Sequence, residues 1–198
     1  MRQNTTLMKK RIILTEQDST TGTTIFLASM SKNHITHLIK HATHDPTLLE
    51  SLGWSPCFQP DETEEFIEAL SNFVLPYSKK SEPVLFGVYL DLKDFPIGYI
   101  ALKGINMETR TAEPGQAVFD PKYRAAGIGT LALKRMLQYA FEELQLKIVG
   151  GTIVPSNQAC LNMCKKLGFV IREPLRNAWT MPDGRVTDLI WVEAHAPN

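Results

Sequence analysis

The chain has 198 residues, of which 21 are basic and 21 acidic, so its formal net charge is zero. This length favours one domain with one substantial core, and the 43% apolar fraction excludes wholesale disorder. A neutral chain lacks the broad positive field on which sequence-independent nucleic-acid binding depends. No uninterrupted apolar stretch approaches the roughly 20 residues of a membrane span. We therefore expect neither a nucleic-acid partner nor a membrane association.

Cysteine usage favours a reducing compartment. The three cysteines, Cys57, Cys160 and Cys164, are an odd number that cannot close a disulfide framework. They lie too far from any histidine at ligand spacing to form a structural zinc site. Near the N-terminus, residues 12–14 form the only apolar run, which is too short for a signal-peptide core. We expect a cytoplasmic protein without a bound metal.

The N-terminal segment has two interpretations. Residues 15–24 are polar and rich in turn formers, so residues 1–22 form either a loose arm or part of a hairpin. In the second case the strands are 11–14 and 24–27. In both cases we place the main domain at 23–198.

Beyond this segment, helical and strand periodicities alternate in a way that is typical of a single α/β domain. Pro114 and Gly115 indicate a bulge or an edge position in one strand, and Gly168 is placed to end a helix. Asp183 and Gly184 predict a hairpin turn. The predicted helices cover residues 31–43, 61–75 and 157–167, with another opening near 128, and the predicted strands cover 83–92, 96–105, 111–120, 146–154, 169–172 and 178–193.

A glycine-punctuated turn, RAAGIGT, occupies residues 124–130 and opens a helix. Unpaired N–H groups at a helix N-terminus favour a phosphate or pyrophosphate, and glycines let the anion approach the backbone. Taken alone, the pattern is equally typical of a tight connection with no ligand. It is not a Walker A loop, because Thr130 and Leu131 follow the last glycine, and it lacks the three-glycine dinucleotide spacing. The helix that follows has an apolar stripe at Ile128, Leu131, Met136, Leu137, Ala140, Phe141 and Leu144.

In this turn, Arg124-Ala-Ala-Gly127-Ile-Gly129 resembles the R/Q-x-x-G-x-G/A motif of the GCN5-related N-acetyltransferases (GNAT). The resemblance is to the branch with ribosomal-protein Nα-acetyltransferases and spermidine acetyltransferases. It spans roughly residues 26–193. The other segments that carry it are 112–115, 119–123, 157–169, which ends in Leu-Gly-Phe, and 175–188.

The resemblance implies the GNAT fold. This is an α/β fold whose mixed, mostly antiparallel sheet splays between its fourth and fifth strands and is flanked by about four helices. It also implies acetyl-CoA as cosubstrate and a primary amine as acceptor, either a polyamine, an aminoglycoside or a protein N-terminus. The amine would attack directly in a ternary complex, and a homodimer is the assembly expected of the family.

The resemblance also implies a set of coenzyme-binding residues. The turn would bind the pyrophosphate, and a backbone N–H of Phe119 or a neighbour would bind the thioester carbonyl. Asn157 would contact the pantetheine arm, although Asn is also favoured as a plain N-cap. The full set is Val118, Phe119, Arg124, Ala125, Ala126, Gly127, Ile128, Gly129, Thr130, Asn157 and Lys166.

Two residues are candidates for catalysis. Glu113 matches an acidic position of this branch and would serve as the base, directly or through water; the alternative is a solvated strand carboxylate. Cys164 stands where many family members have a tyrosine that protonates the departing sulfur. It would either donate a proton or simply pack in the core, as buried cysteines often do.

Four histidines, His34, His37, His41 and His44, fall on one stripe of the first predicted helix. This stripe is turned away from the centre of the helix's apolar face. We leave three interpretations open: a solvated face, part of the acceptor pocket, or opportunistic metal binding through an i, i+4 pair.

Charge is distributed unevenly. Residues 121–180 contain nine Lys or Arg and three Asp or Glu, whereas residues 41–75 contain seven Asp or Glu and no Lys or Arg. An acidic rim would attract a cationic amine, although a solvated helix face would look the same. Two rival functions remain: a coenzyme-binding sensor that has lost turnover, and a nucleic-acid module. The missing tyrosine favours the first rival, and the lack of aromatic and basic interleaving disfavours the second.

Overall fold

The computed structural model describes residues 13–42, 45, 84–181 and 184–197. The predicted helix at 61–75, the residues His44 and Cys57, and most of the acidic segment lie outside these residues. The described elements are β1 Ile13–Gln17, β2 Thr24–Ala28, α1 Lys32–Ala42, β3 Val84–Tyr89, β4 Gly98–Asn106, β5 Thr111–Val118, a 3₁₀ turn at Pro121–Tyr123, α4 Ile128–Gln138, a π turn at Tyr139–Glu143, β6 Ile148–Ile153, α5 Gln158–Lys166, β7 Val170–Thr180 and β8 Val186–His195.

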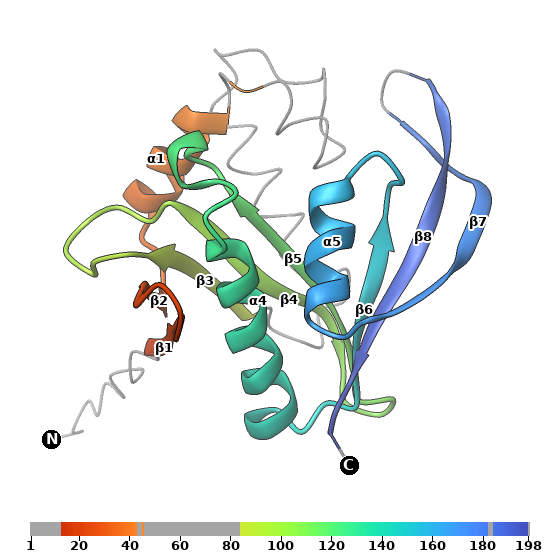
Figure 1. Cartoon of the computed structure of the whole chain (residues 1–198), viewed down its shortest axis with the longest axis horizontal. Coiled ribbons are helices and arrows are strands. Elements are labelled where there is room, and N and C mark those ends of the chain that lie inside the picture. Colours follow the sequence, from red (N-terminus) through yellow and green to blue (C-terminus); the bar gives the residue numbers. More distant parts are fainter. Residues whose placement is uncertain (1–12, 43–44, 46–83, 182–183, 198) are drawn as a thin grey trace, which may run out of the picture.

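One sheet of eight strands organises the described residues, in the order β1-β2-β3-β4-β5-β6-β8-β7. Every neighbouring pair is antiparallel except β5 and β6, which are parallel. Figure 1 shows α4 and α5 on the same face of this sheet. The predicted α/β fold with a mixed, mostly antiparallel sheet is confirmed, and three α-helices are described.

The segment 13–28 forms a hairpin, which is one of the two interpretations of the N-terminal region. Asp18 holds its turn by accepting hydrogen bonds from the backbone of Thr20 at 2.7 Å and Thr21 at 2.9 Å. These two N–H donors lower the pKa of Asp18. Gly22, at φ +72°, supplies the left-handed conformation that closes the turn.

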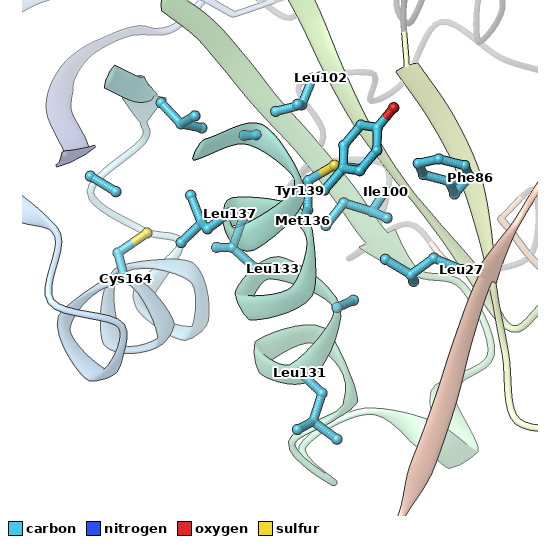
Figure 2. Close-up of a cluster of buried hydrophobic side chains, with 14 of the residues drawn as sticks. Leu27, Phe86, Ile100, Leu102, Leu131, Leu133, Met136, Leu137, Tyr139 and Cys164 are labelled. Carbon is cyan, nitrogen blue, oxygen red and sulfur yellow. The ribbon is translucent and has the colours of Figure 1, made fainter. Parts of the chain in front are cut away.

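The core lies between the sheet and α4. The helix buries an apolar stripe against the sheet, and Figure 2 shows Met136 beside Ile100. Most of the predicted stripe is buried, while Phe141 and Leu144 are half-buried. After Gln138 the helix widens into the π turn, closed by a 3.1 Å hydrogen bond from Leu144 N to Tyr139 O. No helix among the described residues is long and apolar enough to span a membrane.

Strands β5 and β6 separate soon after their pairing begins. The two strands pair only at Thr111 with Ile148 and at Ala112 with Val149, and they diverge beyond these residues (Figure 1). Pro114, two residues after Ala112, lacks the N–H that would continue the ladder. Of the two predicted alternatives at Pro114 and Gly115, the edge position is found, toward β6; the bulge lies elsewhere, on β4 between Lys103 and Asn106.

The prediction for the C-terminal strands needs correction. Residues 173–177 were expected to separate two strands, but β7 runs without interruption from Val170 to Thr180. Its pairing with β8 absorbs Pro174 through shifts in register. Where the β7–β8 ladder is irregular, between Leu175 and Trp179, the Asp188 carboxylate accepts two hydrogen bonds. One comes from the Asn177 backbone N–H at 2.9 Å and the other from the Arg176 guanidinium at 2.6 Å. The sequence pattern did not reveal this side-chain support.

Candidate active site

The separation of β5 and β6 opens a cleft of about 200 Å³. Its walls come from β4, β5, β6 and α5, with residues of the β7–β8 hairpin closing one side. Beyond Ala112, β5 makes no strand pairing on the side that faces β6. Val118 O on this edge accepts from Arg124 Nε, and the other backbone groups of the edge are available to an extended ligand. A ligand with its own amide groups would complete the interrupted ladder.

The glycine turn prepares the N-terminus of α4 for an anion. Gly127, at φ +80°, is the N-cap residue, and α4 has no side-chain cap. The first intrahelical bond is donated by Leu131 to Gly127 O, so the N–H groups of Ile128, Gly129 and Thr130 precede the regular helix ladder. Ala125 and Ala126 are exposed and small beside them. The turn therefore fits the pyrophosphate of coenzyme A, since unpaired donors and the helix dipole both favour an anion.

Arg124 has partners on the other side of this turn. Its Nε donates to Val118 O at 2.8 Å, and its Nη2 donates to Phe119 O at 2.6 Å. Its Nη1 forms an ion pair with Asp45. The guanidinium thus fixes the end of β5, a role that the motif alone did not predict.

The backbone N–H of Phe119, a predicted donor to the thioester carbonyl, already has a partner within the protein. Its N–H donates to Ile97 O at 2.9 Å, which places that donor on the β4 side of the strand. Successive N–H groups of a strand point in opposite directions, so the N–H of Val118 faces away from β4, on the side of β6. Of Val118 and Phe119, only Val118 therefore has an N–H on the edge of β5 that faces β6.

Gln116 is a cleft residue that the sequence interpretation missed. Its side-chain nitrogen lies 2.8 Å from Met163 Sδ of α5, and a Cβ on Gly129 would lie 3.7 Å from the same nitrogen. Its Oε1 is buried and has no hydrogen-bond partner in the described part of the chain. Buried side-chain oxygens normally accept a hydrogen bond, so this unpaired oxygen in the cleft is suited to a ligand that donates one, such as an amide N–H. A lone Gln in a strand carries no sequence signal that could have identified it.

Glu113 lies in the cleft, as expected for the candidate base. Its Oε1 is 2.9 Å from Lys103 Nζ, and its side chain is 46% exposed. Gly151 on β6 makes room for it, because a Cβ there would lie 3.0 Å from Glu113 Cγ. The carboxylate is therefore accessible to a ligand but also paired with a cation.

Asn157 and Lys166 lie at opposite ends of α5. The Asn157 side chain caps the helix by accepting from Cys160 N at 3.1 Å, and Asn157 also lines the cleft. The cap uses its carbonyl oxygen, so its amide group remains the part that could contact pantetheine. Lys166 is exposed in the last turn, outside the cleft lining.

Cys164 belongs to the core as well as to the cleft wall. It is 3% exposed, and Figure 2 shows its side chain directed from α5 toward α4. Its hydrogen bond with Cys160, together with burial, raises the pKa of Cys164 far above its ordinary value. The same hydrogen bond lowers the pKa of Cys160. Cys164 therefore stays protonated in the wall of the cleft.

The three described histidines of the predicted stripe, on α1, do not form a solvated face. His34 Nδ1 lies 2.8 Å from the Tyr89 hydroxyl, and the ring of His37 stacks on Phe95 at 4.4 Å. His41 contacts His37 edge to face at 5.0 Å. Aromatic packing of α1 against β3 and the β3–β4 loop thus explains this stripe. No group of three metal-ligating side chains occurs among the residues that the structure describes.

The comparisons with known proteins agree on one family. The acetyltransferase (GNAT) domain family matches residues 24–170. A GNAT-family acetyltransferase from Bacillus anthracis superposes with a TM-score of 0.71 at 18% identity, covering 93% of this chain and 98% of that one. A comparison with curated protein sequences finds no match.

Two further structures from Vibrio cholerae are similar. A spermidine N-acetyltransferase in complex with CoA and spermine has a TM-score of 0.69 at 20% identity, covering 86% of this chain and 95% of that one. A protein described as a ribosomal-protein-serine acetyltransferase has a TM-score of 0.66 at 21% identity, covering 86% and 93%. The motif match, the splayed sheet and the family match agree: the chain belongs to the GNAT acetyltransferase family and is an acyltransferase.

Proposed function

We propose that the protein transfers an acetyl group from acetyl-CoA to a primary amine by direct attack in a ternary complex. The observation that carries this proposal is the open β5–β6 cleft, with the only carboxylate of its described lining, Glu113, on its wall. An amine attacks a thioester only in its neutral form, so a carboxylate in the cleft is a suitable proton acceptor.

Different parts of the site would bind different parts of the coenzyme. The N-terminus of α4 would hold the pyrophosphate, and the unpaired edge of β5 would hold the pantetheine arm. Bound acetyl-CoA supplies the thioester. The Val118 N–H would donate to the carbonyl oxygen, where negative charge develops, and Glu113 would take the amine proton directly or through water.

For the acceptor, we propose a cationic primary amine. The similar Vibrio cholerae enzyme that contains CoA and spermine supports a cationic acceptor. Glu113 supports it too, since a carboxylate in a cleft attracts an ammonium group. A polyamine, an aminoglycoside or a basic peptide N-terminus would meet these conditions.

An alternative is an acetyl-CoA-binding regulatory module without turnover. Two observations favour it: Glu113 is paired with Lys103, and Cys164 is buried in the core. The experiment that separates the two functions measures acetyl-CoA affinity by calorimetry and thiol release over neutral, acidic and polycationic amines. Thiol release with cationic amines supports the enzyme, binding without release supports the regulatory module, and indifference to acceptor charge contradicts the cationic acceptor.

We also propose a cytoplasmic homodimer. The outer hairpin β7–β8 carries several exposed large apolar side chains, which are common at protein interfaces. Light scattering coupled to size exclusion measures the assembly, and a monomer at micromolar concentration would contradict the dimer. The exposed residues are Val170, Leu175, Trp179, Val186 and Trp191.

A further inference from the structure

Gln116 of β5 has a side-chain oxygen that nothing in the described part of the chain pairs. Its Oε1 is buried without a hydrogen-bond partner, and its Nε2 lies 2.8 Å from Met163 Sδ, which is a weak acceptor. A buried polar atom without a partner costs free energy, because it has lost its hydrogen bonds with water and gained none. A ligand that brings a donor to this oxygen recovers that cost.

The backbone of Gln116 lies on the open edge of the cleft. The N–H of Phe119 points to β4, so the backbone groups of Val118 and Gln116, one and three positions earlier, face β6. Pro114 has no N–H, so Gln116 and Val118 carry the edge donors of β5 beyond Ala112. An extended ligand that pairs with this edge therefore contacts Gln116.

The side chain of Gln116 lies between the two helices that flank the cleft. It contacts Met163 of α5, and a Cβ on Gly129, in the first turn of α4, would lie 3.7 Å from its Nε2. The N-terminus of α4 is the proposed pyrophosphate site, and the β5 edge is the proposed site of the pantetheine arm. A ligand that occupies both sites passes beside Gln116.

The other amide and carboxylate side chains of the described cleft lining already have partners within the protein. Glu113 Oε1 lies 2.9 Å from Lys103 Nζ, and Asn157 Oδ1 accepts from Cys160 N at 3.1 Å. Of the two side-chain amide oxygens in this lining, only that of Gln116 is without a donor. It is therefore the side-chain oxygen best suited to accept from an amide N–H of the ligand.

We propose that Gln116 Oε1 accepts a hydrogen bond from an amide N–H of the pantetheine arm and selects coenzymes that carry this amide. The proposal rests on the proposed function. The terminal torsion of a glutamine side chain is soft, so the oxygen turns toward the ligand at little cost. A hydrogen bond to the arm is the same before and during acetyl transfer, so it contributes to coenzyme affinity and leaves kcat unchanged.

The test combines changes in the protein with changes in the ligand. Gln116→Met keeps the length of the side chain and removes its amide. Gln158→Met makes the same change at an exposed position of α5, outside the cleft lining. The ligands are CoA and two CoA analogues, each with an ester in place of one of the two pantetheine amides. Calorimetry measures the affinity of each ligand for each protein.

We expect Q116M to bind CoA roughly two- to ten-fold more weakly than wild type, the value of one hydrogen bond, and Q158M to bind it like wild type. With at least one ester, this difference between wild type and Q116M should disappear, because an ester oxygen cannot donate. The comparison isolates the side chain, since the backbone acceptors of β5 are the same in both proteins. The KM for acetyl-CoA should rise in Q116M, with kcat near wild type.

Thermal unfolding without ligand checks the fold of the variant. Q116M should unfold at or above the wild-type temperature, because it buries no unpaired oxygen. Gln116→Leu is a second apolar variant, for which we expect the same ligand dependence.

An equal loss of affinity in Q116M for CoA and for both esters would show that Gln116 only fills space, and would overturn the inference. Equal affinities of Q116M and wild type for CoA would overturn it too. If the wild-type protein bound CoA but released no thiol with any amine, the proposed acetyl transfer would fail. The calorimetric comparison would still decide the role of Gln116.

Discussion

Asp45 and Arg124, which are 79 residues apart in sequence, form an ion pair at the end of β5. Asp45 is the one described member of the acidic segment, and Arg124 opens the basic glycine turn. The same guanidinium also holds the carbonyls of Val118 and Phe119. An acidic side chain of one region and a basic side chain of the other therefore meet at the end of β5.

This arrangement predicts that removing Arg124 lowers the free energy of unfolding more than removing the charge of Asp45. Arg124→Ala takes a charged donor from two carbonyls, so we expect the free energy of unfolding to fall by about 2 kcal/mol. Asp45→Asn weakens only a partly exposed ion pair, worth about 1 kcal/mol or less. Urea denaturation of both variants measures these free energies of unfolding. A larger decrease in D45N than in R124A would contradict the prediction.

Arg124→Ala also distinguishes two roles at the site. If the side chain acts through the strand end, the affinity for acetyl-CoA and for acetyl-pantetheine should fall by the same factor. A loss restricted to acetyl-CoA, which alone has the pyrophosphate, would instead show that the guanidinium contacts the anion.

Gly127 offers a direct test of the anion site, with Gly168 as a matched control. Both have positive φ, +80° and +75°, and a Cβ at either would meet nothing within 4 Å. Alanine should therefore cost each helix end a similar strain, about 1–2 kcal/mol. Only G127A places a methyl group at the N-terminus of α4, so only G127A should weaken coenzyme binding, measured by calorimetry. Equal affinities in the two variants would place the pyrophosphate elsewhere.

Asn157 has two separable functions. Its side-chain oxygen caps α5, and its amide group is the predicted contact for pantetheine. Asn157→Ala should lose about 1 kcal/mol of stability together with coenzyme affinity. Asn157→Asp keeps a capping oxygen but has no amide donor, so it should retain stability and lose affinity. If N157D bound acetyl-CoA like wild type, Asn157 would be a plain cap.

Much of this fold is encoded in local pattern. The strands that alternate and the helices with apolar stripes, such as that from Ile128 to Leu137, were predicted because burial on one face imposes a period. The Arg124 motif likewise indicated the turn. The continuity of β7 was missed, since it depends on Asp188 of a neighbouring strand accepting hydrogen bonds from Arg176 and Asn177.

The cleft was predicted only in part, for a physical reason. Backbone sites such as the α4 N-terminus follow from local sequence, whereas partners such as Lys103 for Glu113 depend on the β4–β5 register. Tyr99 and Gln116 carry no local signal, because only the folded sheet leaves their polar atoms buried and unpaired. Histidine spacing on α1 was recognised, but its aromatic partner Phe95 comes from another part of the chain.

Cys164 should prove structural rather than catalytic. Cys164→Ala should lower stability by about 1 kcal/mol through lost packing and leave kcat near wild type. Alkylation at pH 8, followed by peptide mass spectrometry, should modify Cys160 before Cys164, because Cys160 has the lower pKa and is less buried. A large loss of kcat in C164A with intact stability would restore the thiol as the proton donor.

Glu193 of β8 gives the protein an acid-sensitive contribution to stability. Its carboxylate accepts from Trp191 Nε1 at 2.7 Å and from Arg172, and it lies 3.1 Å from His195 Nε2. The Trp191 hydrogen bond, followed by that from Arg172, lowers the pKa of Glu193 from 4.5 to about 2. A carboxyl whose pKa is lower in the folded state stabilises the protein above its unfolded value, and this stabilisation disappears as the pH falls toward the folded value.

Glu193→Gln should therefore unfold at a lower temperature than wild type at pH 7. Between about pH 4.5 and pH 2 the difference should shrink, because protonated glutamate and glutamine then make similar contacts. Thermal denaturation followed by circular dichroism over this range measures it, with Glu173→Gln, an exposed carboxylate on β7, as the control. A difference between E193Q and wild type that stays constant down to pH 2 would show that the contribution does not come from ionisation of Glu193.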